Sequence, residues 1–444
     1  MMKIKRLHII LVVGWLWSCL SVAQAQDNQW LAENNLVMEI RGHYGMFYQH
    51  HFEMEPFNAH FPAFEASLYS KTFGQKEWEG LYNYPYIGVT FYHSNLGGFP
   101  ELGKAYALYP FINYPLIGGD GSELTFKFGA GLAWITNKFD HIYNYKNFAI
   151  GSHLNAAINL SFEYRQRLSS RLIAVGSLGL THFSNGATKS PNYGLNTVSG
   201  ALGLAYYLRT PIQSYTYTKR PDYYPFEFDG KNWFSVDVGY ALGVKDVSQT
   251  LAKQERFLVH EFSVQLMAQF TTCSRAGLSM ALVQDLSDQA LLDHYTDDQG
   301  KLYIIQYGEY SGKDTIAIKK YQMIKPNIGI CYSMTMDRLS FNFEVGYHLD
   351  FRKRVNQRFV FEHDDATNTN YLPPTTLATD FSKGQMYQKV ALRYYLFDQV
   401  YATLGLTAHA MRADYLCFGL SYRFNQKYYL NKHEKQHKHP PGLQ

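Results

Sequence analysis

An alternation of apolar and polar residues with a period of two runs through nearly the whole chain and is the strongest constraint on its fold. A two-residue period places successive side chains on opposite faces of a β-strand. The chain is therefore predicted to be all-β. The segments lie near 35–49, 62–73, 82–94, 103–114, 122–137, 150–168, 171–184 and 194–209 in the first half, and near 231–244, 256–271, 273–285, 322–335, 338–353, 384–397, 399–411 and 413–425 in the second.

The connections between these segments mostly alternate between short and long, although 74–81 is longer than a usual periplasmic turn. Short turns at one end and long loops at the other are typical of a bacterial outer-membrane barrel, and eight strands are enough to close one. We predict a transmembrane antiparallel β-barrel fold, with two eight-stranded barrels in tandem or, as the alternative, one sixteen-stranded barrel. The expected tight turns are 168–171 and those near Cys273, Asp337 and Asp398, and the expected long connections are 137–150, 185–193, 245–255, 286–321 and 354–383.

The composition agrees with a barrel that spans a membrane. Aromatic residues make up 16 % of the chain, with 37 Tyr and 30 Phe, and such residues form the girdles of transmembrane barrels. Beyond the N-terminal leader, no run of about 18 apolar residues predicts a membrane-spanning helix.

Five regions follow from the sequence. Residues 1–25 are predicted to be a secretory signal peptide, because Lys3, Lys5 and Arg6 precede an apolar stretch and small residues end it. We expect a first barrel within 26–209, a proline-containing linker at 210–230 and a second barrel within 231–425. Residues 426–444 are rich in Lys and His and are expected to be disordered.

Charge and cysteine content argue against several classes of function. The signal peptide carries three positive charges, so its removal lowers the formal net charge from +4 to +1 and argues against nucleic acid as a partner. Cys273, Cys331 and Cys417 remain as an odd, scattered set with neither a disulfide framework nor metal-ligand spacing. No metal and no cofactor are expected.

His182 and Ser184 lie two residues apart at the end of the seventh segment, on its apolar face. In a membrane barrel that face contacts lipid, where a polar side chain is costly without a partner. Asn196 begins the next segment on the same face, and antiparallel pairing across 185–193 can bring it close to His182.

These residue types suit an ester hydrolase. A serine hydroxyl becomes a strong nucleophile when a base takes its proton, and histidine is the usual base near neutral pH. A third group orients the imidazole, and hydrogen-bond donors stabilise the oxyanion. His182 is the candidate base, Ser184 the candidate nucleophile and Asn196 the candidate orienting residue, while Asn185 and Gly186 are candidate oxyanion contributors.

The two halves share short stretches that we interpret as a divergent internal duplication. Residues 85–89 read PYIGV where 326–330 read PNIGI, and both 178–181 and 404–407 read LGLT. Extending the second match places Ala408 and Ala410 at the positions of His182 and Ser184. The second half is therefore expected to lack the site.

The motif resembles the outer-membrane lipid A 3-O-deacylases of the PagL type. It consists of His-X-Ser-Asn-Gly at 182–186, Pro-Asn-X-Gly at 191–194 and a polar residue twelve positions after the serine. The resemblance covers about residues 35–209 and implies an eight-stranded barrel whose lipid-facing site removes the ester-linked acyl chain at position 3 of lipid A. By this resemblance His182 is the base, Ser184 the nucleophile and Asn185 an oxyanion contributor. It also implies lipid A or lipopolysaccharide as the substrate and the outer membrane as the location.

Two features depart from that family. Its third triad member is a glutamate, whereas this chain has Asn196, which can orient a histidine but supplies no charge to stabilise an imidazolium. The family type is a single small barrel, whereas this chain has a second half with long loops. These departures favour the alternative of a non-enzymatic outer-membrane barrel, either a porin-like channel or a structural surface protein.

Overall fold

The computed structural model describes most of both halves of the chain. The expected signal peptide, most of the expected linker and the expected tail lie outside the described residues, and those three expectations stay predictions. The described residues are 35–49, 54–73, 77–119, 121–211, 233–246, 256–270, 273–287, 294–296, 302–307, 313–318, 324–336, 338–349, 362–364, 369–371, 386–409 and 412–425.

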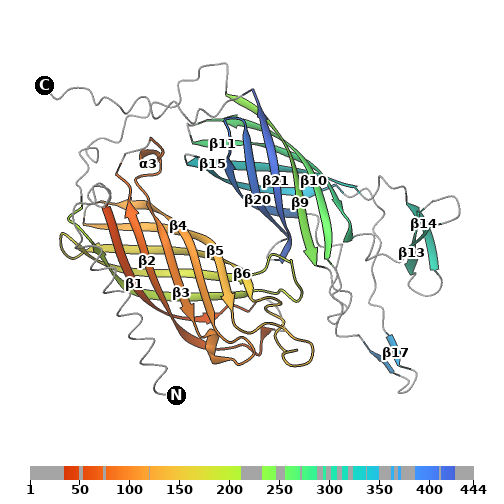
Figure 1. Cartoon of the computed structure of the whole chain (residues 1–444), viewed down its shortest axis with the longest axis horizontal. Helices are drawn as coiled ribbons and strands as arrows, with labels where there is room; N and C mark the ends of the chain where they lie inside the picture. Colours follow the sequence, from red (N-terminus) through yellow and green to blue (C-terminus); the bar gives the residue numbers. More distant parts are fainter. Residues whose placement is uncertain are drawn as a thin grey trace.

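Eight antiparallel strands close the first barrel, in chain order (Figure 1). The ring closes because β1 pairs with β2 on one side and with β8 on the other. The strands are β1 (Asn35–Phe47), β2 (His60–Lys71), β3 (Tyr86–Ser94), β4 (Ala105–Gly118), β5 (Ser122–Ile135), β6 (Leu154–Arg167), β7 (Leu172–Ser184) and β8 (Leu195–Tyr207).

Eight further strands close a second barrel, in which β9 pairs with both β10 and β21. The prediction of two eight-stranded barrels in tandem is confirmed, and the alternative of one sixteen-stranded barrel is wrong. The strands are β9 (Phe234–Asp246), β10 (Arg256–Gln269), β11 (Ser274–Asp285), β15 (Ile324–Met336), β16 (Leu339–His348), β19 (Met386–Tyr395), β20 (Val400–His409) and β21 (Arg412–Phe424).

The connections hold elements that the alternation did not predict. The third predicted segment began at residue 82, but β3 begins at Tyr86, because a short helix α3 (Glu77–Leu81) and a turn come first. A 3-10 turn, η2 (Leu96–Gly98), lies between β3 and β4. In the long connections of the second half, β12 (His294–Thr296), β13 (Leu302–Tyr307) and β14 (Lys313–Ile318) form a sheet, and β17 (Glu362–Asp364) pairs with β18 (Thr369–Tyr371). No helix in the described part of the chain is long and apolar enough to span a membrane.

The two faces of each barrel strand differ as the alternation requires. On β7 and β8 the even-numbered side chains point outward, and Leu178 and Leu202 are 72 % and 78 % exposed. The odd-numbered Thr181 and Ala205 are buried in the interior. An apolar exterior around a filled interior is the pattern of a small transmembrane barrel.

A network of charges fills the middle of the first barrel. Glu163 accepts hydrogen bonds from Arg41 at 2.6 Å, from Arg165 at 2.9 Å and from Asn113 at 2.7 Å. Arg165 also donates to Glu39 at 2.8 Å. The three buried carboxylates balance three buried cations, so the desolvation penalty of each charge is offset by its partners. The network comprises Glu39, Glu65, Glu163, Arg41, Lys127 and Arg165.

Apolar clusters close the barrel on either side of this network. The larger cluster contains Phe61, Phe183 and Leu195 and lies below the long connections. The second barrel has its own polar interior, in which Arg423 donates to Asp237 at 2.7 Å and Tyr415 donates to Glu261 at 2.9 Å. Side chains fill both interiors, which argues against the porin-like alternative.

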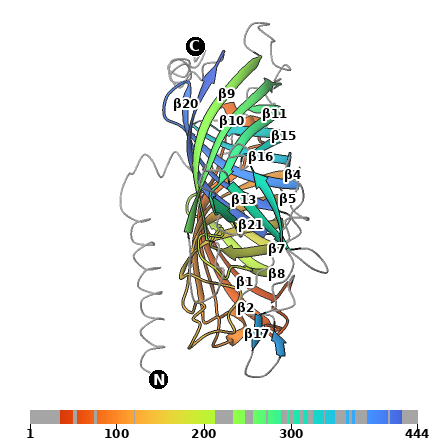
Figure 2. The same cartoon turned by 90° about the vertical axis from the view of Figure 1, so that its right-hand side faces the viewer.

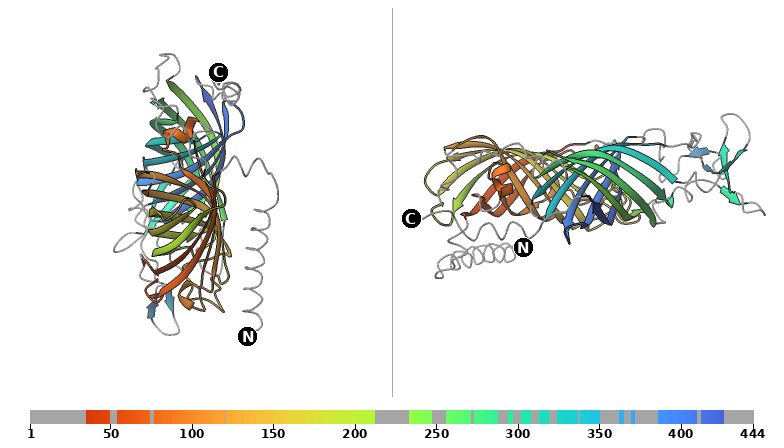
Figure 3. Two further views of the ribbon diagram at one scale, coloured as in Figure 1. Left: turned by 90° about the vertical axis from the view of Figure 1, so that its left-hand side faces the viewer. Right: turned by 90° about the horizontal axis from the view of Figure 1, so that it is seen from above.

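The two barrels lie side by side with their equivalent ends together (Figure 1, Figure 2, Figure 3). We call the end that carries residues 185–193 the outer end and the opposite end the inner end. At the inner end, Tyr82 donates to the Cys273 carbonyl at 3.4 Å, from the β2–β3 connection to the β10–β11 turn. Midway, the rings of Phe128 and Phe341 lie 5.7 Å apart. Each contact joins equivalent elements, because both connections are the second of their barrel, and β5 and β16 are both fifth strands.

The internal matches have different outcomes in the structure. The LGLT stretches lie on β7 and β20, the seventh strand of each barrel, so they occupy equivalent positions. The other match pairs the third strand of the first barrel with the fourth strand of the second, so those positions are not equivalent. Ala408 lies on the outward face of β20, and Ala410 lies outside the described residues.

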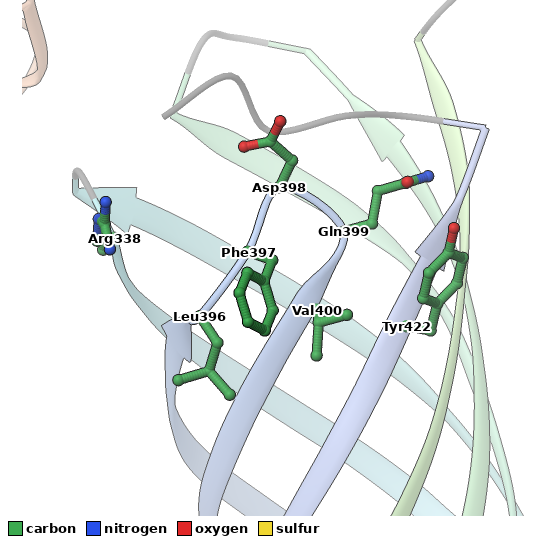
Figure 4. A pocket seen from close by; sticks show the side chains of 7 residues that line it. All are labelled: Arg338, Leu396, Phe397, Asp398, Gln399, Val400 and Tyr422. Atoms are coloured by element: carbon green, nitrogen blue, oxygen red, sulfur yellow. The ribbon is translucent and has the colours of Figure 1, made fainter. Parts of the chain in front are cut away.

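A shallow hollow lies at the inner end of the second barrel, at the β19–β20 turn (Figure 4). Arg338, Tyr422 and residues 396–400 line it. It is at the opposite end of the tandem from the candidate active site.

Candidate active site

Two neighbouring strands carry the candidate residues. His182 on β7 and Asn196 on β8 are direct cross-strand partners in the barrel register. Phe183 and Leu195 also pair, and both are fully buried in the apolar cluster inside the barrel. Because side chains alternate along a strand, this inward pair holds His182 and Asn196 on the outward face.

A short hydrogen bond fixes the imidazole. Nδ1 of His182 lies 2.6 Å from Oδ1 of Asn196. An amide oxygen only accepts, so Nδ1 carries the hydrogen and the lone pair of the ring is on Nε2. This tautomer is the one that a general base for a neighbouring hydroxyl requires.

Ser184 lies on the same outward face but is covered. It pairs with Ala156 of β6, and only 3 % of its surface is exposed. The exposed leucine of the same strand face, Leu178, lies nearer the middle of the barrel.

The segment after Ser184 is held by a dense set of hydrogen bonds. The backbone N–H of Asn185 donates to Oδ1 of Asn192 at 2.9 Å. Nδ2 of Asn185 donates to Oγ of Ser152 at 3.1 Å and to the carbonyl oxygen of Lys189 at 2.7 Å. The chain then turns sharply, because Gly186 has a φ of 64°, a left-handed conformation that glycine adopts without strain.

Gly194 leaves room for the imidazole. Its φ is 79°, and a Cβ placed on it would lie 2.8 Å from Cε1 of His182 and 3.1 Å from the carbonyl oxygen of Phe183. Any side chain at this position would therefore displace the ring or the strand. The glycine acts as a spacer that lets the β8 backbone pass close beside His182.

All five predicted residues gather at the outer end of β7 and β8, and the direct contact among them joins His182 to Asn196. Sequence reasoning missed Ser152, Asn192 and Gly194. The Pro-Asn-X-Gly stretch at 191–194 contained the signal for the last two, although their partners were not foreseen. Ser152 lies in a long connection and had no signal of its own.

Two stretches of the chain match known protein families. Residues 63–205, which hold every predicted site residue, match the family of lipid A 3-O-deacylase (PagL). Residues 374–426 match the C-terminal domain of acyloxyacyl hydrolase. No curated protein matches the chain.

Three solved structures illustrate the range of folds that resemble parts of this chain. Neisserial surface protein A is 9 % identical, with a TM-score of 0.28 over 39 % of this chain and 97 % of that one. The outer membrane enzyme PagL is 14 % identical, with a TM-score of 0.26 over 37 % of this chain and 97 % of that one. The toluene transporter TodX of Pseudomonas putida is 7 % identical, with a TM-score of 0.17 over 91 % of each chain.

The family matches confirm the resemblance inferred from the His-X-Ser-Asn-Gly motif, and they fall on a β-barrel. One match covers most of the first barrel and the other covers the last three strands of the second. The chain is thus an ester hydrolase of the bacterial outer membrane, and its first barrel matches the lipid A 3-O-deacylase (PagL) family over residues 63–205.

Proposed function

We propose that this enzyme removes an ester-linked 3-hydroxyacyl chain from position 3 of lipid A by a Ser–His mechanism on the lipid-facing rim of the first barrel. The observation that carries the proposal is the 2.6 Å contact between His182 and Asn196, with Ser184 next to the histidine on the same strand face. The family of the first barrel supports lipid A as the substrate.

In the first half of the reaction, Oγ of Ser184 attacks the ester carbonyl carbon while Nε2 of His182 accepts the hydroxyl proton. The tetrahedral intermediate then collapses. The bond to the sugar oxygen breaks, and that oxygen takes the proton from His182 as it leaves. The acyl chain remains as an ester on Ser184.

In the second half, a water molecule attacks the acyl-serine while His182 again accepts the proton. Collapse returns the proton to Oγ of Ser184 and releases the 3-hydroxy fatty acid. The hydrogen bond from Nδ1 to Asn196 keeps the ring oriented throughout, because it is directional and short. Asn196 provides orientation without the charge that a glutamate would add.

Asn185 and Gly186 are the proposed oxyanion contributors. The backbone and side-chain N–H groups of Asn185 already donate to Asn192, Ser152 and Lys189. Among the described residues, no partner is found for the backbone N–H of Gly186. We therefore assign the oxyanion contact to Gly186 and the shaping of the turn to Asn185.

The rim position suits the substrate. An acyl ester of lipid A lies at the boundary between sugar headgroup and hydrocarbon, and the site lies at the outer end of an apolar barrel face. An ester bound at this boundary would place its acyl chain against the outward leucines of the barrel.

The test is mass spectrometry of lipid A from cells that express the full chain or its variants. We expect the wild-type chain to remove one 3-hydroxyacyl chain, and both Ser184→Ala and His182→Ala to lose at least about a thousandfold in rate. Ser177→Ala is the matched control, because Ser177 lies on the same strand within 3.4 Å of Arg41 in the interior. Full deacylation by both site variants would reject the proposal.

A further inference from the structure

We infer that the second barrel forms one wall of the acyl-binding site of the first barrel, and that Leu406 and Leu416 on that wall help to select the length of the acyl chain. The inference rests on the function proposed above and adds a role for the second barrel.

The turn at Gly186, which follows Ser184, packs directly on the second barrel. A Cβ placed on Gly186 would lie 3.4 Å from Cδ1 of Leu406 and 3.6 Å from Cβ of Leu416. Gly186 follows Ser184 by two residues, a span of about 7 Å in extended chain. The two leucines therefore line the turn that directly follows Ser184.

A polar clamp fixes this contact. The backbone N–H of Asp246, at the end of β9, donates to the carbonyl oxygen of Ala187 at 2.8 Å. Oδ2 of Asp246 accepts from the backbone N–H of Ser190 at 3.0 Å. The turn after Ser184 is thus bonded to the second barrel through both backbone and side chain, which fixes the distance from the serine to the leucines.

Exposure of the outward side chains shows which flank of the site is covered. On the β6 side, Ile158 and Leu160 are half-buried, and so is Leu180 of β7. On the β8 side, Val198, which is in register with Leu180 and Leu160, is 40 % exposed. On the second barrel, Leu416 is half-buried, whereas Leu420 on the same strand face is 58 % exposed. At this height the β6 flank of the site is therefore more covered than the β8 flank.

Charges at the outer rim give the bound lipid a direction. Burial, together with the nearby cations Lys138 and Arg256, lowers the pKa of Lys189. Lys138 and Lys189 belong to the first barrel and Arg256 begins β10 of the second. Cations gathered at this rim suit an anionic headgroup, so the acyl chain would run from Ser184 toward the membrane interior, along the wall.

The role of the wall has a measurable consequence. An acyl chain that runs beside Leu406 and Leu416 has less space when either leucine is replaced by a larger residue. The loss of space is greater for a long acyl chain than for a short one. Pocket contacts with a few methylene groups discriminate by about tenfold or more. A second barrel that acted only as a support would change the rates for all chain lengths equally.

The experiment measures kcat/KM of the purified full chain for a series of 3-O-acyl lipid A substrates that differ only in acyl length. For Leu416→Trp we expect the ratio of long-chain to short-chain kcat/KM to fall by about tenfold or more, with short-chain hydrolysis retained. For Leu416→Ala we expect the ratio to shift in the opposite direction. Leu420→Trp is the matched control, because it adds the same side chain to the exposed part of the same strand.

The outcomes separate the two proposals. Unchanged length preference in both Leu416 variants, or an equal loss for every length, overturns the inference even when Ser184→Ala is inactive. A fully active Ser184→Ala overturns the proposed mechanism instead. Heat-modifiable migration in gels reports whether each variant folds. Leu406→Ala is a second variant that enlarges the space beside the same wall, and it should shift the ratio in the same direction as Leu416→Ala.

Discussion

Replacing Gly194 with alanine tests whether the position of the His182 ring controls catalysis. The new Cβ would lie 2.8 Å from Cε1 of the imidazole. Ordinary contacts begin near 3.4 Å, so the ring must move by about 0.6 Å. That movement acts on a ring held by a hydrogen bond of only 2.6 Å to Asn196.

The expected effect is mainly on kcat. A displacement approaching 1 Å at a reacting group costs up to about a hundredfold in rate, so we expect kcat to fall by about ten- to a hundredfold. The φ of 79° at this position adds a backbone penalty, which for alanine is about 1–2 kcal/mol. That penalty is small enough for the barrel to remain folded.

Gly200→Ala is the matched control on the same strand. A Cβ there would meet Cδ2 of Leu178 at 3.5 Å, an ordinary contact, and we expect kcat to stay within about twofold of wild type. The assay is the initial rate of fatty-acid release from lipid A in detergent micelles. A Gly194→Ala enzyme with unchanged kcat, or with a change in KM alone, would refute the idea that the glycine positions the base.

Two further substitutions test the site and the interior. Asn196→Leu removes the acceptor for Nδ1 of His182 and should lower kcat by at least about a hundredfold. Asn196→Asp keeps the acceptor and adds a negative charge, so it should raise kcat. A lower kcat for the aspartate variant would contradict this role of Asn196. Glu163→Gln removes the negative charge that faces Arg41 and Arg165, and it should destabilise the first barrel by about 3–5 kcal/mol. The measurement is the urea concentration at the midpoint of unfolding, which should fall. An unchanged midpoint would show that the buried network does not depend on this carboxylate.

The strand order of both barrels was predictable from sequence, because each strand alternates and most connections are short or long in turn. The connection between β2 and β3 is the exception, because it is long although it lies at the inner end. The shared face of His182, Ser184 and Asn196 followed from the same period. Their contact distance did not, since it depends on the register between β7 and β8. That register is set by the buried pair Phe183 and Leu195, which the sequence shows only as apolar residues.

The contacts between the barrels were beyond sequence reasoning. Gly186 meets Leu406 and Leu416 across more than two hundred residues of chain, and local patterns contain no signal for such pairs. The pairing of charges inside the first barrel could not be predicted from sequence for a similar reason. Glu39 and Arg165 come from strands far apart in the chain, and closure of the ring brings them to 2.8 Å.

The meeting of equivalent elements between the two barrels resembles the self-complementary interface of a two-fold dimer. In a dimer of separate chains, the fraction assembled would depend on how much protein the membrane holds. Here a covalent connection supplies the partner at a high effective concentration, so assembly does not depend on expression level or dilution. The contact between Phe128 and Phe341 can therefore form in every molecule, at a fixed ratio of one first barrel to one second barrel.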